Sequence, residues 1–455
     1  MKTVFLFIYH HSHIADLLHT NYIKYLSEKY KVVVITPQRE GDHIISKNKI
    51  FTSPNIIYAE FPLEHAKWWR RFKLLRASCV RQFDNLLSVQ INYKRTRVDD
   101  KRRVVLRAVS LMLPRFITST AMFTWLETFI IPASKIFDEY AEKYKPSIIL
   151  TATPGFTHFE AWAIILAKKS NIPTAAINFT WDNLTSNGKL IRKTDYLIVW
   201  NEIIKKEAKE YHNYSTKDVF VSGPIRFDNY FNHIEGEMTR ENFLKSKNLD
   251  PARKTVLITT MSKNNYPYHK ELVQSIISIR DSNSPKKRFN IFIRVHPIDS
   301  FEIYSDIAKA NYENLYIERA GKQIKPDSAI GQKVRMDEED MLNLKHTLMY
   351  SDICINPFST ISLESMIFDK PVINIGLDPE YRPALNYVHY KPLLDKKAVK
   401  VAYTEKQLED YIDLYLTKPE TDQENRKKIV KDFIGFTDGL SYKRNADFLE
   451  EIFKK

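Results

Sequence analysis

Short apolar runs that alternate with helical patterns constrain the fold of this chain more than any other feature. Apolar residues run through 4–9, 32–36 and 55–59, and between the first two Leu17, Leu18, Tyr22 and Leu26 recur at helical spacing. After residue 148 the alternation resumes, with strands expected at 148–151, 174–179, 196–199 and 219–222 and helices at 157–170 and 202–212. Because parallel strands joined by helices are buried on both faces, the sequence predicts an α/β fold with a doubly wound sheet.

A second set of strands and helices follows a turn signal. Ser222-Gly223-Pro224 and a polar stretch over 229–253 mark a boundary. Beyond it we expect a helix at 268–280 and strands at 256–259, 292–295, 315–317, 353–355 and 372–375. We predict an N-terminal Rossmann-like domain over 1–227, a C-terminal one over 228–425, and helices over 426–455 that cross back to the first. The two domains are expected to face each other across a cleft.

Residues 66–131 interrupt the first domain as a helical insertion that holds most of the excess positive charge. The chain has a net charge of +14, and 13 Lys or Arg stand between residues 66 and 108 against three Asp. Trp68, Phe72, Leu75 and Cys79 recur there at helical spacing among basic residues. The pattern fits a helix that lies on an anionic membrane, and it equally fits a solvated basic helix packed through one apolar stripe.

Membrane spanning and nucleic-acid binding are both disfavoured. The apolar run at 116–131 contains Glu127 and is shorter than the roughly 20 residues that a bilayer requires. No zinc-ligand spacing or RNP-like motif accompanies the basic residues. Two cysteines, Cys79 and Cys354, cannot build a disulfide framework. We therefore expect a cytoplasmic protein that lies peripherally on the inner face of the cell membrane.

Residues 351–376 predict an anion site, because a strand, a loop, a short helix and a second strand follow one another there. With only 10 Gly in the chain, no glycine-rich loop is available to bind phosphates, so hydroxyls at the helix start, Ser359 and Thr360, are the remaining choice. Glu364 lies four residues after Thr360, about 6 Å along the axis on the same face. One ligand can place a phosphate at the hydroxyls and a ribose at the carboxylate. The alternative is an ordinary capped helix with a solvated Glu.

Other strand ends carry polar residues that we assign to the same donor site. Arg294-Val295-His296-Pro297 closes the strand at 292–295, and His296 there can bind a phosphate or protonate a leaving oxygen. Thr260 and Ser262 follow the strand at 256–259. For His296 the alternative is a structural histidine.

In the first domain, two loops are expected to serve the acceptor. His10, His11, His13 and Asp16 follow the first strand, and His13 and Asp16 are candidates for the general base. After the strand at 174–179, Trp181 can stack on a sugar or base, while Asp182 and Asn183 can orient an acceptor hydroxyl. The alternatives are a polar loop that caps a helix and a turn built by Asp-Asn.

These motifs resemble the nucleotide-binding domain of GT-B glycosyltransferases, especially bacterial enzymes of capsule, O-antigen and teichoic-acid assembly. The resemblance rests on His296-Pro297 and on the segment from Ser351 to Ile375 with its Ser359-Thr360 and Glu364, and it extends to residues 179–188, 222–228 and 438–444. It implies a nucleotide sugar held by the second domain, with His296, Ser359 and Thr360 at the phosphates and Glu364 at the ribose. It also implies no metal and no cofactor, and UDP as the nucleotide with CMP as the alternative.

The expected function is a glycosyltransferase that moves a sugar from a nucleotide donor to a growing surface polysaccharide or lipid-linked glycan. Two enzymatic alternatives are a UDP-GlcNAc type 2-epimerase and a CDP-glycerol glycerophosphotransferase. The non-enzymatic alternative is a basic peripheral membrane-binding protein in which the strand-end residues are structural.

Overall fold

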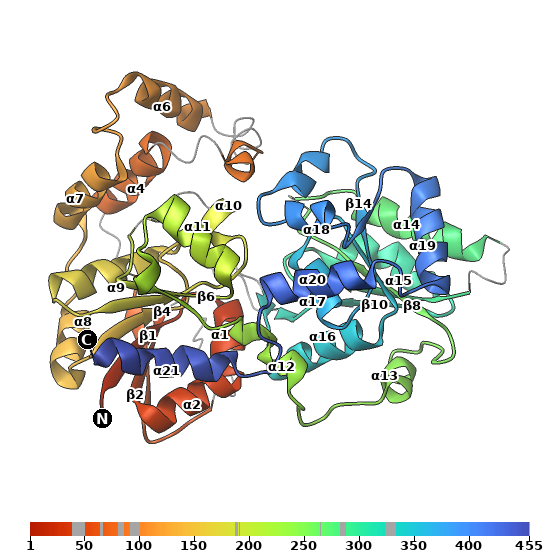
Figure 1. The fold of residues 1–455 in the computed structure, drawn as a ribbon, viewed down its shortest axis with the longest axis horizontal. Coiled ribbons are helices and arrows are strands. Elements are labelled where there is room, and N and C mark those ends of the chain that lie inside the picture. The colour runs from red at the N-terminus through yellow and green to blue at the C-terminus, as the bar shows by residue number, and fades with distance from the viewer. Residues whose placement is uncertain are drawn as a thin grey trace. The chain divides into compact units, whose positions relative to one another are not determined.

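The computed structural model describes residues 1–38, 51–63, 67–80, 86–91, 101–186, 190, 192–263, 265–282, 288–323 and 334–454. The chain forms two compact units (Figure 1). Unit 1 contains Met1–Asp228 and Phe436–Lys455, and unit 2 contains Asn229–Gly435.

Unit 1 is built on a seven-stranded parallel sheet in the order β3-β2-β1-β4-β5-β6-β7. Every strand expected from the apolar runs of the first domain is present, which confirms the predicted doubly wound sheet. The strands are β1 (Thr3–Phe7), β2 (Lys31–Gln38), β3 (Ile56–Pro62), β4 (Ile148–Thr151), β5 (Thr174–Ile177), β6 (Tyr196–Val199) and β7 (Val219–Val221).

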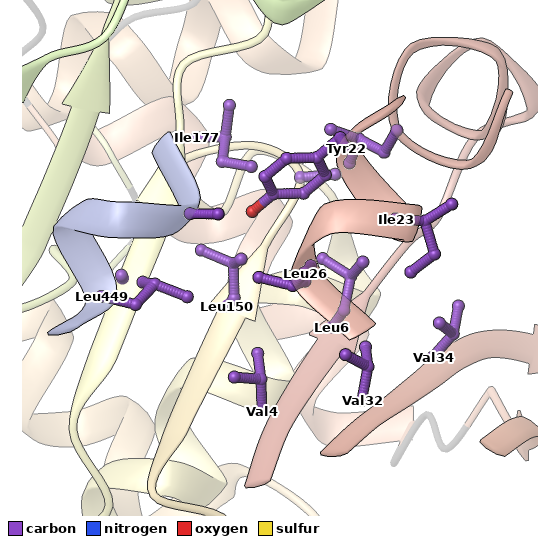
Figure 2. Packing of buried hydrophobic residues seen from close by; sticks show 14 of the residues in the cluster. Val4, Leu6, Tyr22, Ile23, Leu26, Val32, Val34, Leu150, Ile177 and Leu449 are labelled. Atoms are coloured by element: carbon purple, nitrogen blue, oxygen red, sulfur yellow. The ribbon is translucent and has the colours of Figure 1, made fainter. Parts of the chain in front are cut away.

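Helices cover both faces of this sheet because its strands are apolar on both sides. Val4 and Leu6 of β1 pack in one core with helix α2 (Asn21–Lys29) and the C-terminal helix α21 (Ser441–Phe453), and Figure 2 shows Leu449 of α21 beside this group. The intervening Phe5 and Phe7 point to the other core, formed with α8 (Lys135–Tyr144) and α9 (His158–Lys169). Other helices in the described part of unit 1 are α1 (His11–Leu18), α10 (Asn183–Ser186), α11 (Glu202–His212) and α12 (Asp228–Phe231, which begins at the last residue of unit 1), with the 3-10 turns η1 (Thr216–Asp218) and η2 (Ile225–Phe227).

The single helix that the sequence predicts between β1 and β2 is present as two helices, α1 and α2. Thr20 interrupts it, because its hydroxyl accepts the backbone N–H of Tyr22 and so caps the start of α2.

The chain leaves unit 1 at Asp228 and returns at Phe436, and one side chain joins these two places. The Asp228 carboxylate accepts backbone N–H groups of Ser441 at 3.0 Å and Tyr442 at 2.7 Å, at the start of α21. Helix α21 is an integral part of unit 1, since Asn445 accepts the buried hydroxyl of Tyr22 at 2.9 Å.

Three helices of the insertion gather beside one another (Figure 1), and one of their side chains, Trp69, joins the core that holds Phe5 and Phe7 of β1. They are α4 (Lys67–Cys79), α6 (Lys101–Met112) and α7 (Thr120–Ile130). The wholly buried Glu127 of α7 accepts Trp69 Nε1 and Arg76 Nη1, both at 2.8 Å, and so fixes α4 to α7. Phe72 and Cys79 of the predicted apolar stripe pack with Phe123, whereas Trp68 and Leu75 of the same stripe are exposed. In the described part of the chain, no helix is long and apolar enough to cross a membrane.

Unit 2 repeats the architecture with a six-stranded parallel sheet in the order β10-β9-β8-β13-β14-β15. The strands are β8 (Thr255–Thr259), β9 (Asn290–Val295), β10 (Leu315–Arg319), β13 (Ile353–Asn356), β14 (Val372–Ile375) and β15 (Lys400–Ala402), with a small antiparallel pair β11 (Lys322–Gln323) and β12 (Val334–Arg335). The helices are α13 (Arg240–Ser246), α14 (His269–Asp281), α15 (Ser305–Lys309), α16 (Glu338–Tyr350), α17 (Thr360–Ile367), α18 (Lys391–Asp395), α19 (Glu405–Thr417) and α20 (Gln423–Phe433). The edge strand β15 was not expected from the sequence.

Candidate active site

The strand order of unit 2 reverses between β8 and β13. From β8 the chain proceeds outward to β9 and β10, and from β13 it proceeds to β14 and β15 on the other side. In open α/β sheets, ligands bind beyond the carboxyl ends of strands at such a reversal. Thr260 follows β8 and Ser359 follows β13, so the two predicted hydroxyl groups flank this place.

Thr260 holds the ends of β8 and β9 together. Its backbone N–H donates to the carbonyl oxygen of Arg294 at 3.2 Å, and its hydroxyl oxygen accepts the backbone N–H of His296 at 2.8 Å. The carbonyl of Ser262 accepts the N–H groups of the next turn, from Asn265 at 2.7 Å and Tyr266 at 3.1 Å. Thr260 therefore positions His296, and Ser262 shapes the loop.

The His296 ring is half-buried at the end of β9. Its Nδ1 accepts the backbone N–H of Ile298 at 3.3 Å, which leaves the ring proton on Nε2. Burial lowers the pKa of His296, and the nearby Asp299 raises it in part. A neutral imidazole with Nε2–H can donate a hydrogen bond to a phosphate oxygen.

A second imidazole, His269 at the start of α14, lies close to His296 and was missed by the sequence reasoning. Its Nε2 accepts the backbone N–H of Met261 at 2.8 Å, within the loop that follows β8. Burial, and then the charge of His296, lower its pKa to about 3. A lone histidine at an expected helix start was the only signal, and it is too common to single out.

Ser359 caps helix α17, as the sequence predicted for a hydroxyl at this helix start. Its Oγ accepts the backbone N–H of Ile361 at 3.4 Å, and Thr360 is the first helical residue. Both side chains are half-buried. The positive end of the helix dipole favours an anion at this end, where the N–H groups of Ile361 and Ser362 already donate to Ser359.

A buried polar network fixes the helix start to the sheet. Ser362 Oγ contacts Tyr390 Oη at 2.7 Å and donates to Asn356 Oδ1 at 3.1 Å. Tyr390 Oη donates to Asn374 Oδ1 at 2.9 Å, and all four side chains are buried. Because this network is satisfied internally, it holds α17 rigidly against β13 and β14.

Glu364 is only 2% exposed, and its carboxylate accepts the hydroxyl of Tyr230. The alternative of a solvated Glu is therefore wrong, because Tyr230 of unit 2 covers the carboxylate, and the ribose contact stays a prediction. A ribose hydroxyl reaches this carboxylate only by sharing it with Tyr230 or displacing the tyrosine.

Arg294 faces an internal ion-pair cluster. Its guanidinium pairs with Glu318 and makes a two-point contact with Asp340 at 2.9 and 3.0 Å, and the side chain is 5% exposed. All of its charge is compensated inside the unit. We therefore assign Arg294 to positioning β9 and leave it out of the nucleotide-contacting set.

In unit 1, four side chains from α1, the loop after β5 and η2 meet beyond the carboxyl ends of the strands. The His13 ring lies 4.3 Å from that of Phe179, and the Arg226 guanidinium lies 5.4 Å from the same ring. Arg226 also lies 3.9 Å from the carboxylate of Asp16. Arg226 is the functional candidate that the sequence reasoning missed, although it stands in the Pro-Ile-Arg-Phe-Asp segment that carried the family resemblance.

His13 itself is nearly inaccessible. It is 2% exposed, and burial, then His10, then Arg226 lower the pKa of its imidazole. The ring is therefore neutral at pH 7 and packs between His10 and Phe179. The side chain of His11 lies outside the described part of the chain.

Trp181, Asp182 and Asn183 form a tight turn after β5. Trp181 is 3% exposed, so its ring is part of the core. Asn183 accepts the backbone N–H of Thr180 at 2.9 Å, and Asp182 accepts the hydroxyls of Thr180 and, at 2.8 Å, Ser186. Of the three, only Asp182 is partly exposed.

Comparison with known proteins connects this geometry to one family. The family model described as CDP-glycerol:poly(glycerophosphate) glycerophosphotransferase matches residues 142–451. No curated protein matches the sequence closely enough to count as a relative.

Several solved structures share the fold of the whole chain. A putative UDP-N-acetylglucosamine 2-epimerase from Listeria monocytogenes has 11% identity and a TM-score of 0.57, over 100% of this chain and 97% of its own. The wall teichoic acid polymerase TagF has 12% identity and a TM-score of 0.53, over 100% of this chain and 89% of its own. A glycosyltransferase from Rickettsia africae has 12% identity and a TM-score of 0.51, over 100% and 99%. At this identity the likeness shows the fold, which is the predicted GT-B type with two Rossmann-like domains.

Proposed function

This chain belongs to the CDP-glycerol:poly(glycerophosphate) glycerophosphotransferase family, and we propose that it transfers glycerol phosphate, or a related polyol phosphate, from a cytidine diphosphate donor. The acceptor in this proposal is a hydroxyl at the end of a cell-surface polymer. Family membership makes the chain a transferase, and its place in cell-wall glycan assembly is part of the proposal. The donor and the acceptor are the proposed part.

The observation that carries the donor assignment is the pairing of strand ends in unit 2. The Thr260 hydroxyl fixes His296, and the neighbouring strand β13 leads to the capped start of α17. In this proposal the N–H groups of the first turn of α17 bind the diphosphate, and His296 Nε2–H donates to the oxygen of the departing phosphate.

In the proposed reaction the acceptor oxygen attacks the phosphorus that carries the glycerol. A bond forms between that oxygen and the phosphorus, and the bond from the phosphorus to the bridging oxygen of the diphosphate breaks. CMP leaves with the electron pair of that bond. The proton of the acceptor hydroxyl passes to a base, after which the transferred phosphate is a diester.

We assign the base to Asp182 of unit 1. His13 is buried and packed between two rings, whereas Asp182 is partly exposed and stands three residues after Phe179. His13, Asp16 and Phe179 then act by positioning the loops, and Arg226 offers a cation to a phosphate-bearing acceptor. Trp181 and Asn183 shape the turn that presents Asp182.

The test is donor turnover by the purified chain with an oligomeric acceptor. CDP-glycerol and UDP-GlcNAc are supplied separately, and release of CMP or UDP is followed. We expect CMP release that depends on acceptor. His296→Ala and Asp182→Asn should each lower kcat/KM by about a hundredfold or more. His233→Ala, at an 81% exposed side chain in unit 2, is the matched control.

Other outcomes select other functions. Acceptor-dependent release of UDP favours the nucleotide-sugar glycosyltransferase that the strand-end motifs also predict. Conversion of UDP-GlcNAc without acceptor identifies an epimerase. If none of CDP-glycerol, CMP, UDP or UDP-GlcNAc raises the melting temperature, the proposal is refuted. The non-enzymatic alternative, a basic peripheral membrane-binding protein, is then favoured.

A further inference from the structure

Tyr230 of α12 covers the side of α17 that carries the carboxylate assigned to the donor ribose. Its hydroxyl donates to Glu364 Oε2, and its ring lies edge to face with the ring of Phe368, with centroids 5.3 Å apart. Glu364 and Phe368 follow Thr360 at intervals of four residues, so the three lie along one side of the helix. A ligand that extends from the start of α17 along this side therefore meets Tyr230 at Glu364.

The tyrosine hydroxyl makes the kind of contact that a ribose hydroxyl would make. Both groups are O–H donors, and a carboxylate accepts either of them in a charge-assisted hydrogen bond. Glu364 is only 2% exposed, so a sugar cannot simply add to one side of a solvated carboxylate. The oxygen that Tyr230 occupies is one for which a sugar hydroxyl must compete.

Two fixed points hold Tyr230 within reach of Glu364. Before it in the chain, the Asp228 carboxylate accepts two backbone N–H groups at the start of α21. After it, the carbonyl oxygen of Asn232 accepts Nζ of the buried Lys345 of α16 at 2.6 Å. A donor fixed in this way acts as an intramolecular competitor, at a high effective concentration.

We propose that Tyr230 is a specificity-determining residue of the donor site, because its hydroxyl competes with the donor ribose for the Glu364 carboxylate. When a ribonucleotide binds, a ribose hydroxyl replaces the tyrosine hydroxyl, and the tyrosine side chain turns away. One hydrogen bond is exchanged for another, so the ribose contact adds little affinity while Tyr230 is present. This inference rests on the proposed function only in requiring a donor with a ribose, whichever base it carries.

Removal of the tyrosine hydroxyl should strengthen ribonucleotide binding. In Tyr230→Phe the ring can stay on Phe368, but the buried carboxylate of Glu364 loses this hydrogen bond in the free chain. A bound ribose hydroxyl then restores the bond without displacing anything. We expect the Kd of a ribonucleotide to fall at least about tenfold, whereas a tyrosine that only supports the fold would weaken binding when it is replaced.

Titration calorimetry of the full chain with CMP, UMP and their 2′,3′-dideoxy analogues tests the proposal. In the unchanged chain, a ribonucleotide should bind within about threefold of its dideoxy analogue, because the ribose contact is an exchange. This comparison needs no variant. In Tyr230→Phe the ribonucleotide should bind at least about tenfold more tightly, and the dideoxy analogue should bind as before. The same pattern should appear with whichever base the chain accepts.

Two further variants are controls. Tyr415→Phe in α19 also takes a hydroxyl from a carboxylate, since Tyr415 donates to Asp422 at 2.9 Å. Asp422 pairs with Lys400 at the start of β15, the opposite edge of the sheet from the strand ends of the site, so this variant should bind nucleotides as the unchanged chain does. Glu364→Gln/Tyr230→Phe should bind a ribonucleotide at most about threefold more tightly than Glu364→Gln alone, because the shared carboxylate is absent.

Three results would overturn the proposal. One is ribonucleotide binding by Tyr230→Phe that is equal to or weaker than binding by the unchanged chain. Another is equal tightening for the dideoxy analogue, because Tyr230 would then obstruct the site and not compete for Glu364. The third is discrimination of about tenfold or more between a ribonucleotide and its dideoxy analogue in the unchanged chain, which is the value of a ribose contact without a competitor.

The outcome for the proposed function is separate. Absence of binding by all four nucleotides would refute both this inference and the proposed function. Binding in the expected pattern without release of CMP from CDP-glycerol would refute the proposed function alone. Release of CMP with no effect of Tyr230→Phe on nucleotide affinity would refute only the role of Tyr230.

Discussion

The ion pair between Arg76 and Glu127 gives a direct test of how the helical layer of unit 1 is held. Glu127 is 0% exposed and accepts both Arg76 Nη1 and Trp69 Nε1 at 2.8 Å. Glu127→Gln removes the negative charge and leaves the guanidinium of Arg76, with an 8% exposed side chain, uncompensated. Breaking a buried pair on one side costs about 3–5 kcal/mol.

The assay is amide hydrogen exchange of α4 and α7, because the loss is local to their contact. A cost of about 3 kcal/mol lowers the protection of these amides by about a hundredfold, up to the limit set by their own opening free energy. Amides of the sheet of unit 1 should change little. Glu139→Gln, an exposed position on the neighbouring α8, is the matched control.

Removing both charges separates an ion-pair effect from a packing effect. Arg76→Leu/Glu127→Gln removes both charges of the pair and keeps an acceptor for Trp69 Nε1, so α4 and α7 should be better protected than in Glu127→Gln alone. The reasoning is refuted if Glu127→Gln keeps the protection of the unchanged chain, or if the double variant is less protected than the single one.

Three further predictions concern other parts of the fold. Burial raises the pKa of Glu160 to about 7 from 4.5. Between these two pH values the folded chain keeps the carboxyl proton while the unfolded chain loses it. The free energy of unfolding should therefore fall by up to about 3 kcal/mol as pH rises from 4.5 to 7. Urea unfolding of unit 1 across that pH range should show this slope, and Glu160→Gln should flatten it; an equal slope in the variant contradicts the assignment. Gly223→Ala should lower the free energy of unfolding by about 2 kcal/mol or more, because φ is +87° and a Cβ would stand 2.4 Å from Ser441 Oγ. If adding Ser441→Ala restores the melting temperature of Gly223→Ala in full, the contact with Ser441 alone explains the loss, and the cost assigned to the positive φ of residue 223 is wrong. Asn374→Leu removes one of the acceptors of the buried Tyr390 hydroxyl and the amide that donates to Asn356, and should cost about 1–3 kcal/mol and weaken donor binding in a titration. Unchanged donor affinity would show that the network does not position α17.

The central strands of both sheets were predictable because they are short apolar runs buried on both faces. Val4 and Phe5 show why, since neighbouring residues of β1 enter opposite cores. The edge strand β15 escaped because Lys400–Ala402 is three residues long and only half-buried. The break between α1 and α2 has a local signal in the sequence, the capping residue Thr20. It was not predicted because the helical spacing of apolar residues continues across Thr20.

The site was predictable only where its geometry is local. Ser359 at a helix start and His296 at a strand end follow from neighbouring residues. The partners of Arg294 stand 24 and 46 residues farther along the chain, and Tyr230 stands 134 residues before Glu364. No periodicity records such pairings, because they arise when separate elements pack. The same holds for Arg226, which tertiary structure alone brings to His13.

The Asp228 carboxylate joins the two segments of unit 1, which are separated in the sequence by unit 2. It ties the point where the chain departs to the helix that completes the domain after the return, so all of residues 229–435 form one insertion between two fastened positions. A chain cut before α21 would lose part of the core around Tyr22 and Leu449 and should not yield a folded first half. A chain in which a short linker joins residue 228 directly to residue 436 should fold, because the Asp228 carboxylate already holds the start of α21 close to residue 228. The two Rossmann-like halves can therefore be separated as modules by excision of the second, but not by simple truncation.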